Sequence, residues 1–365
     1  MSNLADMCRR RWAALRNRLL LSARFRRAAM AFPPTRPIAR RYAADLFDLT
    51  AGFVYAQVAA AMIESGLLAA IQKRAIADEE AALCAGLTPV GAATLLRAAA
   101  SLRLVERIGA AWTLGPRGAA LLASPGVADM IAHHRLLYAD LADPLATLRG
   151  AGPGRLARLW RYGADADPAD VAAYSRLMAA SQPMVSEQAI SAYPFRRHRR
   201  MLDIGGGEGA FVTAVASAAP GLHFGLLDLP AVIERARNRL SGAGLADRVD
   251  LHPGGFLDQP LPSGYDLLTL VRVLHDHDDA PALALLRVIR AALPSGGRLL
   301  IVEPMAGDGP AGLAYFGLYL AAMGSGRPRS PAEIREMLAA AGFARTRLRR
   351  TSLPLVARII QADVS

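Results

Sequence analysis

The sequence has few of the features that mark disulfide-rich, zinc-binding or secreted proteins. Its 365 residues include two cysteines, Cys8 and Cys84, which are too few for a disulfide framework and lack the Cys/His spacing of a zinc site. The apolar run Leu19–Leu21 is too short for a signal peptide, and Arg24 follows closely. We therefore expect a protein of a reducing compartment, the cytoplasm, with no bound metal.

Acidic residues are nearly absent from the first part of the chain, and this absence locates the net charge. The formal charge is +12, and residues 1–41, with eleven arginines and one acid, carry +10 of it. The remaining chain is almost neutral, which argues against nucleic acid as the partner of the protein body.

The basic segment at residues 1–41 is called the arm below. Trp12, Leu15, Leu19 and Phe25 fall roughly on one face of a helix there, with arginines elsewhere. The arm is too charged to span a bilayer. Such a segment is typical of peripheral contact with an anionic membrane surface. A disordered tail, or an arm packed on a partner subunit, remains open.

The length and the 53% content of hydrophobic residues predict two folded domains plus the arm. Pro33, Pro34 and Pro37 end the arm. The changes of pattern predict four segments: an arm at 1–41, a winged-helix-like dimerisation domain at 42–125, a helical segment lining the substrate at 126–198, and a cofactor-binding domain at 199–365.

A helix followed by a hairpin is predicted within residues 42–125. Thr88 and Pro89 are typical of a helix start, and residues 102–116, LRLVERIGAAWTLGP, alternate across a turn. This is the pattern of a winged helix. The candidate recognition helix offers only Arg97 and Arg103 as bases, so we expect a dimerisation role rather than DNA binding.

The segment at residues 126–198 reads as largely helical, with His133 and His134 side by side. Because adjacent residues on a helix point in different directions, we expect at most one of these histidines to line a pocket. Further along, the uncharged stretch Gly309–Gly326 is predicted to be a buried helix that lines an apolar cavity. An ordinary core helix explains the same pattern.

From Arg200 onward, five short apolar runs alternate with helical or loop sequence, and two further strands follow near the C-terminal end. This alternation predicts an α/β fold, a Rossmann-like seven-stranded sheet with helices on both faces. Ser330 and Glu333 form a capping box that opens the last helix.

A glycine-rich turn follows the first strand of this sheet, in LDIGGGEG. Gly205 and Gly207 allow a cofactor to approach the backbone, and Asp228 ends the next strand, where a ribose diol would be bound. NAD and S-adenosylmethionine both suit this pattern. Asp203 before the glycines suits an ammonium group better than a pyrophosphate, and the closing strand pair differs from a standard dinucleotide half.

Taken together, DIGGGEG, LLDLP, LVRVLHDHDD and LLIVEP resemble the class I S-adenosylmethionine-dependent O-methyltransferases of small molecules, over about residues 42–363. More narrowly, LFDLTAGFVYAQV, HHRLLYADLADPLATLRG and YLAAMGSGRPRS are similar to the family that methylates the tertiary hydroxyl of acyclic carotenoids, of the demethylspheroidene or hydroxyneurosporene type, in photosynthetic bacteria. The resemblance implies a homodimer with a winged-helix dimerisation domain before the methyltransferase domain, and an apolar carotenoid substrate.

The resemblance also implies roles for residues toward S-adenosylmethionine and its product S-adenosylhomocysteine. The implied cofactor-binding residues are Asp203, Gly205 and Gly207 at the methionine part, Asp228 at the ribose, Leu229 at the adenine, and Gly255, Phe256 and Arg272. This sequence departs from the family at Gly255, where an acid is usual, so the adenine contact passes to the Phe256 backbone or to Asp258.

The resemblance makes His275 the catalytic base and Glu303 the acid that orients it. A tertiary alcohol is a very weak acid, so a neutral imidazole is needed to accept its proton as the bond to carbon forms. A second orienting acid of the plant enzymes is replaced here by Pro328. The residues expected to line the substrate are Tyr174, Met178, Tyr315, Tyr319 and Met323.

Three other functions stay open at this stage. A C-methyltransferase of the bacteriochlorophyll pathway shares the architecture. A ligand-sensing transcription regulator would use the winged helix and the arm, and an NAD oxidoreductase would use the glycine turn.

Overall fold

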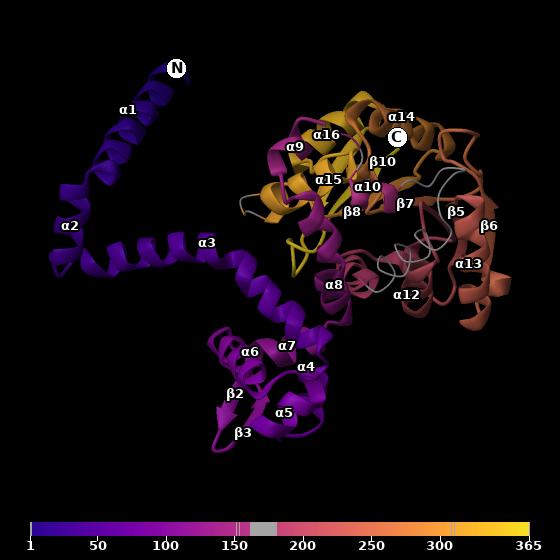
Figure 1. Cartoon of the computed structure of the whole chain (residues 1–365). Coiled ribbons are helices and arrows are strands. Elements are labelled where there is room, and N and C mark those ends of the chain that lie inside the picture. The colour runs from indigo at the N-terminus through magenta and orange to yellow at the C-terminus, as the bar shows by residue number, and fades with distance from the viewer. Residues whose placement is uncertain are drawn as a thin grey trace. The chain divides into compact units, whose positions relative to one another are not determined.

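A computed structural model describes residues 2–150, 152, 154–160, 181–307, 309 and 311–364 (Figure 1). The chain divides into two compact units, Met1–Ala119 and Ala120–Ser365. Each unit is described by itself below. The dimerisation and substrate-lining roles of the predicted segments remain predictions.

The N-terminal unit begins with three helices: α1 (Ser2–Leu21), α2 (Ala23–Ala31) and α3 (Arg36–Glu64). Ser22 caps α2 by accepting a hydrogen bond from the Phe25 N–H, and Pro37 lies in the first turn of α3. The prolines separate α2 from α3 as predicted. However, α3 runs without a break through the predicted boundary at residues 41 and 42, because Pro37 is tolerated in a first helical turn.

Helix α3 is the longest of the described helices, and most of its apolar surface is exposed. By length and composition alone it is able to cross a membrane, yet only 11% of its apolar window is buried. Leu46, Phe47, Leu49 and Phe53 are exposed on it. The helical spacing of Leu46, Phe47, Phe53, Val54 and Val58 predicts a helix here, but not that one helix of 29 residues begins before residue 42.

The rest of this unit is a small helical domain with a hairpin. Its elements are α4 (Leu67–Lys73), β1 (Ile76–Ala77), α5 (Asp78–Ala85), α6 (Pro89–Ser101), β2 (Val105–Ile108), β3 (Ala111–Leu114) and α7 (Pro116–Leu122). The Thr88 hydroxyl caps α6 by accepting from the Gly91 N–H at 3.1 Å, and β2 pairs antiparallel with β3. The predicted helix and hairpin are therefore confirmed.

The C-terminal unit opens with helices that precede the sheet. These are α8 (Pro125–Asp140), α9 (Pro144–Leu148), α10 (Arg155–Trp160) and a helical stretch at 181–192. The Asp140 carboxylate accepts from the backbone N–H groups of Arg155 and Leu156, at 2.8 Å each, and so links α8 to the start of α10. The helical prediction is confirmed for the described part of this region.

A seven-stranded sheet follows, in the order β6-β5-β4-β7-β8-β10-β9. Its strands are β4 (Arg200–Ile204), β5 (His223–Asp228), β6 (Val249–Pro253), β7 (Leu267–Val271), β8 (Arg298–Glu303), β9 (Arg345–Arg349) and β10 (Arg358–Asp363). The first five pair in parallel, and β10 pairs antiparallel with β8 and with β9. The predicted sheet with its closing strand pair is confirmed.

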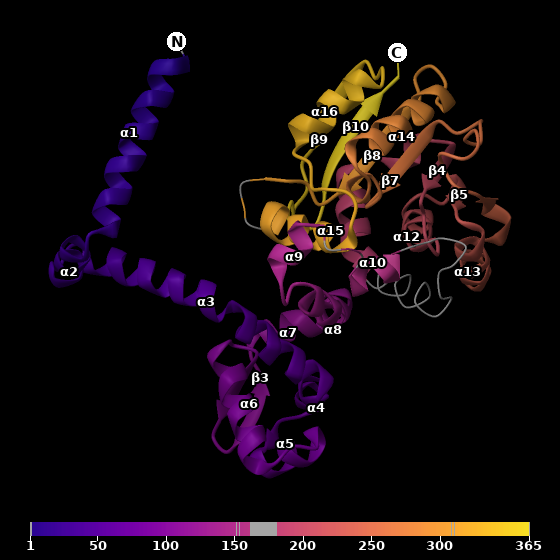
Figure 2. The same ribbon diagram turned by 45° about the horizontal axis from the view of Figure 1, so that its top comes forward.

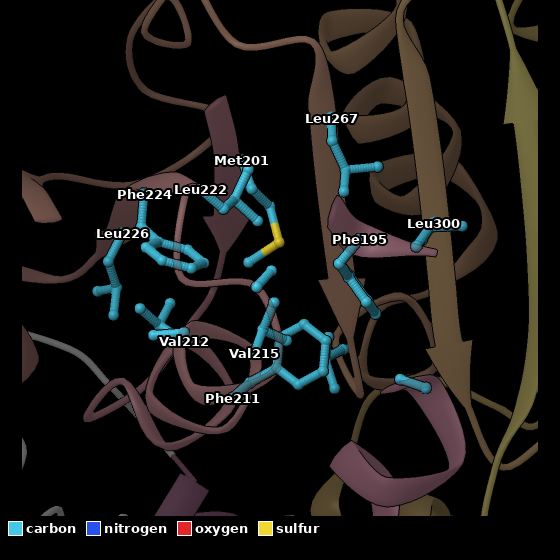
Figure 3. Packing of buried hydrophobic residues seen from close by; sticks show 14 of the residues in the cluster. Phe195, Met201, Phe211, Val212, Val215, Leu222, Phe224, Leu226, Leu267 and Leu300 are labelled. Carbon is cyan, nitrogen blue, oxygen red and sulfur yellow. The ribbon is translucent and has the colours of Figure 1, made fainter. Parts of the chain in front are cut away.

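Helices cover both faces of this sheet. The 181–192 stretch, α12 (Ala210–Ala218) and α13 (Pro230–Gly242) pack on one face, and α14 (Asp279–Ala292) and α16 (Pro331–Ala340) on the other. Figure 3 shows part of the first core, in which sheet and helix side chains interdigitate: Met201, Phe224, Phe211, Val212 and Val215. Ser330 and Glu333 form the predicted capping box at α16.

The predicted helix at Gly309–Gly326 is shorter in the structure. A single π-helical turn, Ala311–Tyr315, leads into α15 (Phe316–Met323). Gly324 ends the helix in a left-handed conformation with φ 82°, which glycine adopts without steric cost. Tyr319, Leu320 and Met323 are buried, so the prediction of burial holds for this shorter helix.

Candidate active site

The glycine turn between β4 and α12 has a backbone that only glycine adopts readily. Gly205 has φ 67° and Gly207 has φ 58°. A Cβ atom on Gly205 would lie 2.8 Å from the Cγ2 atom of Val273, which precedes the His275 turn. The glycine turn and the segment that carries His275 are therefore in close contact, because β4 and β7 are neighbouring strands.

Asp203 lies at the end of β4 and is buried. Its Oδ1 atom accepts a hydrogen bond from the Thr269 hydroxyl at 2.6 Å, whereas Oδ2 has no partner among the described residues. Burial, with a smaller contribution from Asp228, raises the pKa of Asp203 to about 7. A buried acceptor without a donor is costly, and an ammonium group would satisfy it. This geometry fits the amino group of S-adenosylmethionine.

Asp228 ends β5 and faces the glycine turn. Its Oδ2 atom accepts from the Gly207 N–H and its Oδ1 atom from the Leu229 N–H, each at 2.7 Å. Burial raises the pKa of Asp228, while these two backbone donors lower it. Each oxygen keeps a further lone pair, so the carboxylate can accept from a ribose diol while it holds the turn.

The segment after β6 contains Gly255, Phe256 and Asp258. A Cβ atom on Gly255 would lie 2.0 Å from the Asp258 Oδ2 atom, so a larger residue does not fit here without movement. The Phe256 ring packs edge-on against the His277 ring, with 5.3 Å between centroids. Phe256 therefore lies beside the turn that carries His275, and the adenine contact remains a prediction.

His275 lies in a buried 3-10 turn, Leu274–Asp276, just after β7. Its Nε2 atom is 3.3 Å from the Asp276 Oδ1 atom, and no partner of Nδ1 is found among the described residues. Burial lowers the pKa of His275 to about 3, and Arg272 and Arg329 add to the effect. The imidazole is thus neutral at pH 7, with Nε2 near the Asp276 carboxyl group, whose pKa burial raises, and with Nδ1 unpaired.

Glu303 ends β8 and is fully buried. It is predicted to orient the imidazole ring of His275, but its hydrogen bond to His275 is made with the backbone. Its Oε2 atom accepts from the backbone N–H of His275 at 3.1 Å, and burial raises the pKa of Glu303 to about 7. The reason is register: β8 lies beside β7, so this carboxylate reaches the main chain that leaves β7. The carboxyl group near the ring is that of Asp276, which sequence analysis did not single out.

The loop before α16 braces the His275 turn from the other side. Arg329 is fully buried and donates to the carbonyl oxygens of Leu274, at 2.9 Å, and His277, at 2.7 Å. The Arg327 N–H donates to the His275 carbonyl at 2.9 Å. Sequence analysis treated this loop only as the place where Pro328 replaces an acid. The sequence feature that could have indicated this brace is the second arginine of GRPRS, Arg329.

Arg272 has a left-handed backbone, with φ 56°, although it is not glycine. Its guanidinium donates to the Ser181 hydroxyl at 2.6 Å and to the Gln182 side chain. The predicted cofactor residue is thus tied to the helical stretch at 181–192. Its own contact with the cofactor remains a prediction.

The predicted substrate residues fall in two groups. Tyr174 and Met178 lie outside the described residues. The others, Tyr315, Tyr319 and Met323, lie on or next to α15, which Figure 2 shows beside α9 and α10. The Phe316 ring of α15 is 6.3 Å from the His275 ring, between centroids, so this helix borders the site.

Both adjacent histidines of α8 have a tyrosine partner, and the expectation that at most one of them lines a pocket stays a prediction. His133 Nε2 is 3.0 Å from the Tyr319 hydroxyl, and His134 Nε2 is 2.7 Å from the Tyr315 hydroxyl. Both rings reach α15, because the two tyrosines lie about one turn apart and their long side chains extend to α8.

A search for three His, Cys, Asp or Glu side chains close enough to hold a metal ion finds no such group in the described part of the chain.

Comparisons with known proteins identify the family of this chain. Residues 138–344 match the O-methyltransferase domain family. The chain is 42% identical over 353 residues to a demethylspheroidene O-methyltransferase of Cereibacter sphaeroides, covering 94% of this chain and 93% of the relative. A protein of the same name from Rhodobacter capsulatus is 40% identical over 95% of this chain and 88% of its own.

The fold is similar to that of human N-acetylserotonin methyltransferase, solved in complex with S-adenosylmethionine. The TM-score is 0.76 at 23% identity, over 89% of this chain and 98% of that one. With the sheet, the glycine turn and the near full-length relatives together, the chain belongs to the O-methyltransferase family and is an S-adenosylmethionine-dependent O-methyltransferase.

Proposed function

We propose that this enzyme methylates the tertiary hydroxyl of an acyclic hydroxycarotenoid in carotenoid biosynthesis. The substrate class is taken from the two relatives named for demethylspheroidene, which match nearly the whole chain. The observation that carries the chemistry is the unpaired Nδ1 atom of His275, on a segment that touches the glycine turn.

When bound, S-adenosylmethionine supplies an electrophilic methyl group that already carries its leaving group. Asp203, the glycine turn and Asp228 would hold it, and His275 would accept the hydroxyl proton at Nδ1. Because its pKa is lowered, His275 stays neutral at pH 7 but is a weak acceptor. Proton transfer must therefore accompany formation of the C–O bond, and alignment of the partners can contribute about 7–11 kcal/mol.

The side chains around the base suit an apolar substrate. The Phe316 ring neighbours the His275 ring, with 6.3 Å between centroids, and Tyr315 packs edge-on against Phe316 with 4.9 Å between centroids. An aromatic wall excludes water from the hydroxyl, which strengthens the interactions that align it.

The test is a mass-spectrometric assay with isotope-labelled S-adenosylmethionine. The purified enzyme is given an acyclic carotenoid with a tertiary hydroxyl, the same carotenoid without the hydroxyl, and tetrapyrrole precursors of bacteriochlorophyll. We expect label in the hydroxycarotenoid alone. Label in a tetrapyrrole, or in the carotenoid lacking the hydroxyl, would contradict the proposal and favour C-methylation.

We also propose that the enzyme is a homodimer held through α3. A stripe of exposed apolar residues on this helix supports the proposal: Leu46 is 66% exposed, Phe47 66%, Leu49 82% and Phe53 66%. Soluble monomers rarely leave so large an apolar patch uncovered, and a second copy would bury it. Analytical ultracentrifugation should give a dimer for the natural chain and a monomer for Leu49→Ser/Phe53→Ser. A monomeric natural chain would contradict the dimer.

Finally, we propose that α1 and α2 bind an anionic membrane surface from the cytoplasmic side. Their arginines, together with exposed Trp12 and Phe25, support peripheral contact. Asp45 and Asp48 within the apolar part of α3 would be costly inside a bilayer, so we assign that helix to dimerisation and not to a membrane span.

A further inference from the structure

Two histidine–tyrosine hydrogen bonds join α8 to the start and the middle of α15. His133 is bonded to Tyr319 and His134 to Tyr315, at 3.0 and 2.7 Å. Burial lowers the pKa of His133 to about 4 and also lowers that of His134, and it raises the pKa of Tyr315 to about 12. Each histidine with a lowered pKa is neutral at pH 7, and each Nε2 atom shares one hydrogen bond with a tyrosine hydroxyl, whose direction depends on the tautomer of the imidazole.

The two bonds lead to different places in the fold. Tyr319 is buried in a cluster with Leu137, Leu156 and Met323, so the His133 bond ends in the packing between helices. Tyr315 is the last residue of the π-helical turn and precedes Phe316. The His134 bond thus reaches Tyr315, the residue next to Phe316, whose ring neighbours that of His275.

The His134–Tyr315 hydrogen bond ends on the π-helical turn, and this location connects it to the candidate site. Such turns are rare and are found frequently at functional sites. Here the turn decides where α15 begins, and so where Phe316 lies relative to the imidazole, at 6.3 Å between ring centroids. The described side-chain hydrogen bond of Tyr315 is the one to His134, and it ties the turn to α8.

We propose that His134 is a positioning residue for methyl transfer: through Tyr315 it holds the π-helical turn and thereby the Phe316 ring over His275. His133, in contrast, stabilises the packing of α8 on α15 without affecting the chemical step. The inference rests on the proposed role of His275 as the base.

The first experiment compares His134→Leu with the matched control His133→Leu. Loss of one neutral hydrogen bond corresponds to about a threefold to tenfold effect. We expect His134→Leu to lower kcat by that factor with little change in KM for S-adenosylmethionine, and His133→Leu to keep kcat within about twofold. Both should lower the melting temperature. Equal losses of kcat in the two variants would overturn the proposal.

Two further variants separate positioning from a direct role of Tyr315 at the substrate. His134→Gln places an amide near the position of Nε2 and should restore most of kcat. Tyr315→Phe should lower kcat about as much as His134→Leu, and the double variant should lose no more than either single one. Additive losses, or no rescue by glutamine, would contradict a role exerted through the bond.

A spectroscopic measurement keeps the test independent of the substrate. Ring currents from Phe316 shift the His275 ring-proton resonance, which is assigned from its absence in His275→Ala. His134→Leu should move this resonance, and His133→Leu should leave it in place. If the natural enzyme methylates no hydroxycarotenoid, the proposed function fails while this readout still tests the positioning. An unmoved resonance in His134→Leu would refute the positioning itself.

Discussion

The two units of this enzyme distribute polar and apolar residues in opposite ways. In the C-terminal unit, titratable groups are buried: Asp203 is 1% exposed, Glu303 0% and His275 6%. In the N-terminal helices, large apolar side chains are exposed, and Leu49 of α3 is 82% exposed. Burying the first set shifts pKa values, and exposing the second leaves surface that association can cover. The buried titratable groups place the candidate chemistry in the C-terminal unit, and the exposed apolar side chains support the proposed association through the N-terminal unit.

The largest effect should come from removing the base in the C-terminal unit. His275→Ala should lower kcat by about 10²–10⁴-fold, while affinity for S-adenosylhomocysteine stays nearly unchanged, because the glycine turn is intact. Turnover with labelled S-adenosylmethionine and calorimetric titration measure the two quantities. Unchanged turnover would remove His275 as the base.

The next effect concerns the buried brace of the His275 turn. Arg329→Met keeps much of the side-chain volume but leaves the carbonyl oxygens of Leu274 and His277 without their donor. Each buried acceptor left unpaired costs about 1–3 kcal/mol, so thermal unfolding should shift down by several degrees. Arg327→Met, at a half-exposed guanidinium, is the matched control and should shift it less. Similar decreases of the unfolding temperature in both variants would contradict a particular role of Arg329 in stabilising the His275 turn.

A pH profile sharpens the comparison further. The pKa of Asp203 is raised by folding to about 7, so the carboxyl group is mostly protonated below that pH. Because an ammonium group needs the ionised form, affinity for S-adenosylhomocysteine should be about tenfold weaker at pH 6 than at pH 8. Calorimetry should show that Asp203→Asn binds S-adenosylhomocysteine weakly, with the same affinity at pH 6 and pH 8.

The control for that profile is Asp250→Asn, at a half-exposed carboxylate of β6, which should keep the natural pH dependence. A raised pKa also means that ionised Asp203 destabilises the free protein above its unfolded pKa near 4. The free Asp203→Asn variant should therefore melt at a higher temperature than the natural enzyme at pH 8. A flat natural binding profile would contradict the assignment.

The smallest effect on catalysis should come from the N-terminal helices. Deleting residues 1–32 should reduce binding to vesicles that contain anionic lipid, by about 1 kcal/mol per well-placed base lost, and leave activity on detergent-solubilised substrate unchanged. Vesicles of neutral lipid serve as the control. Equal vesicle binding by the natural and the truncated chain would contradict the membrane proposal. Loss of activity in the truncated chain would contradict the view that the N-terminal helices take no part in catalysis.

Much of the C-terminal unit could be predicted because its signals are local. Five apolar runs and a closing pair of strands predict the sheet. The motif LDIGGGEG predicts the glycine turn, and Ser330 with Glu333 predicts the start of α16. The contacts of Glu303 could not be predicted in the same way. Which atoms of the His275 turn it meets depends on how β8 lies beside β7, and no local pattern records that register.

The sequence by itself determined the order of strands and helices, the left-handed glycine turn and the basic charge of the arm, because these depend on backbone conformation, periodicity and composition. Only the tertiary structure decided that Glu303 accepts a hydrogen bond from the backbone N–H of His275, and that both adjacent histidines of α8 are hydrogen-bonded to Tyr315 and Tyr319. Those contacts join residues distant in sequence, and their geometry and pKa shifts arise only when packing removes water from around them.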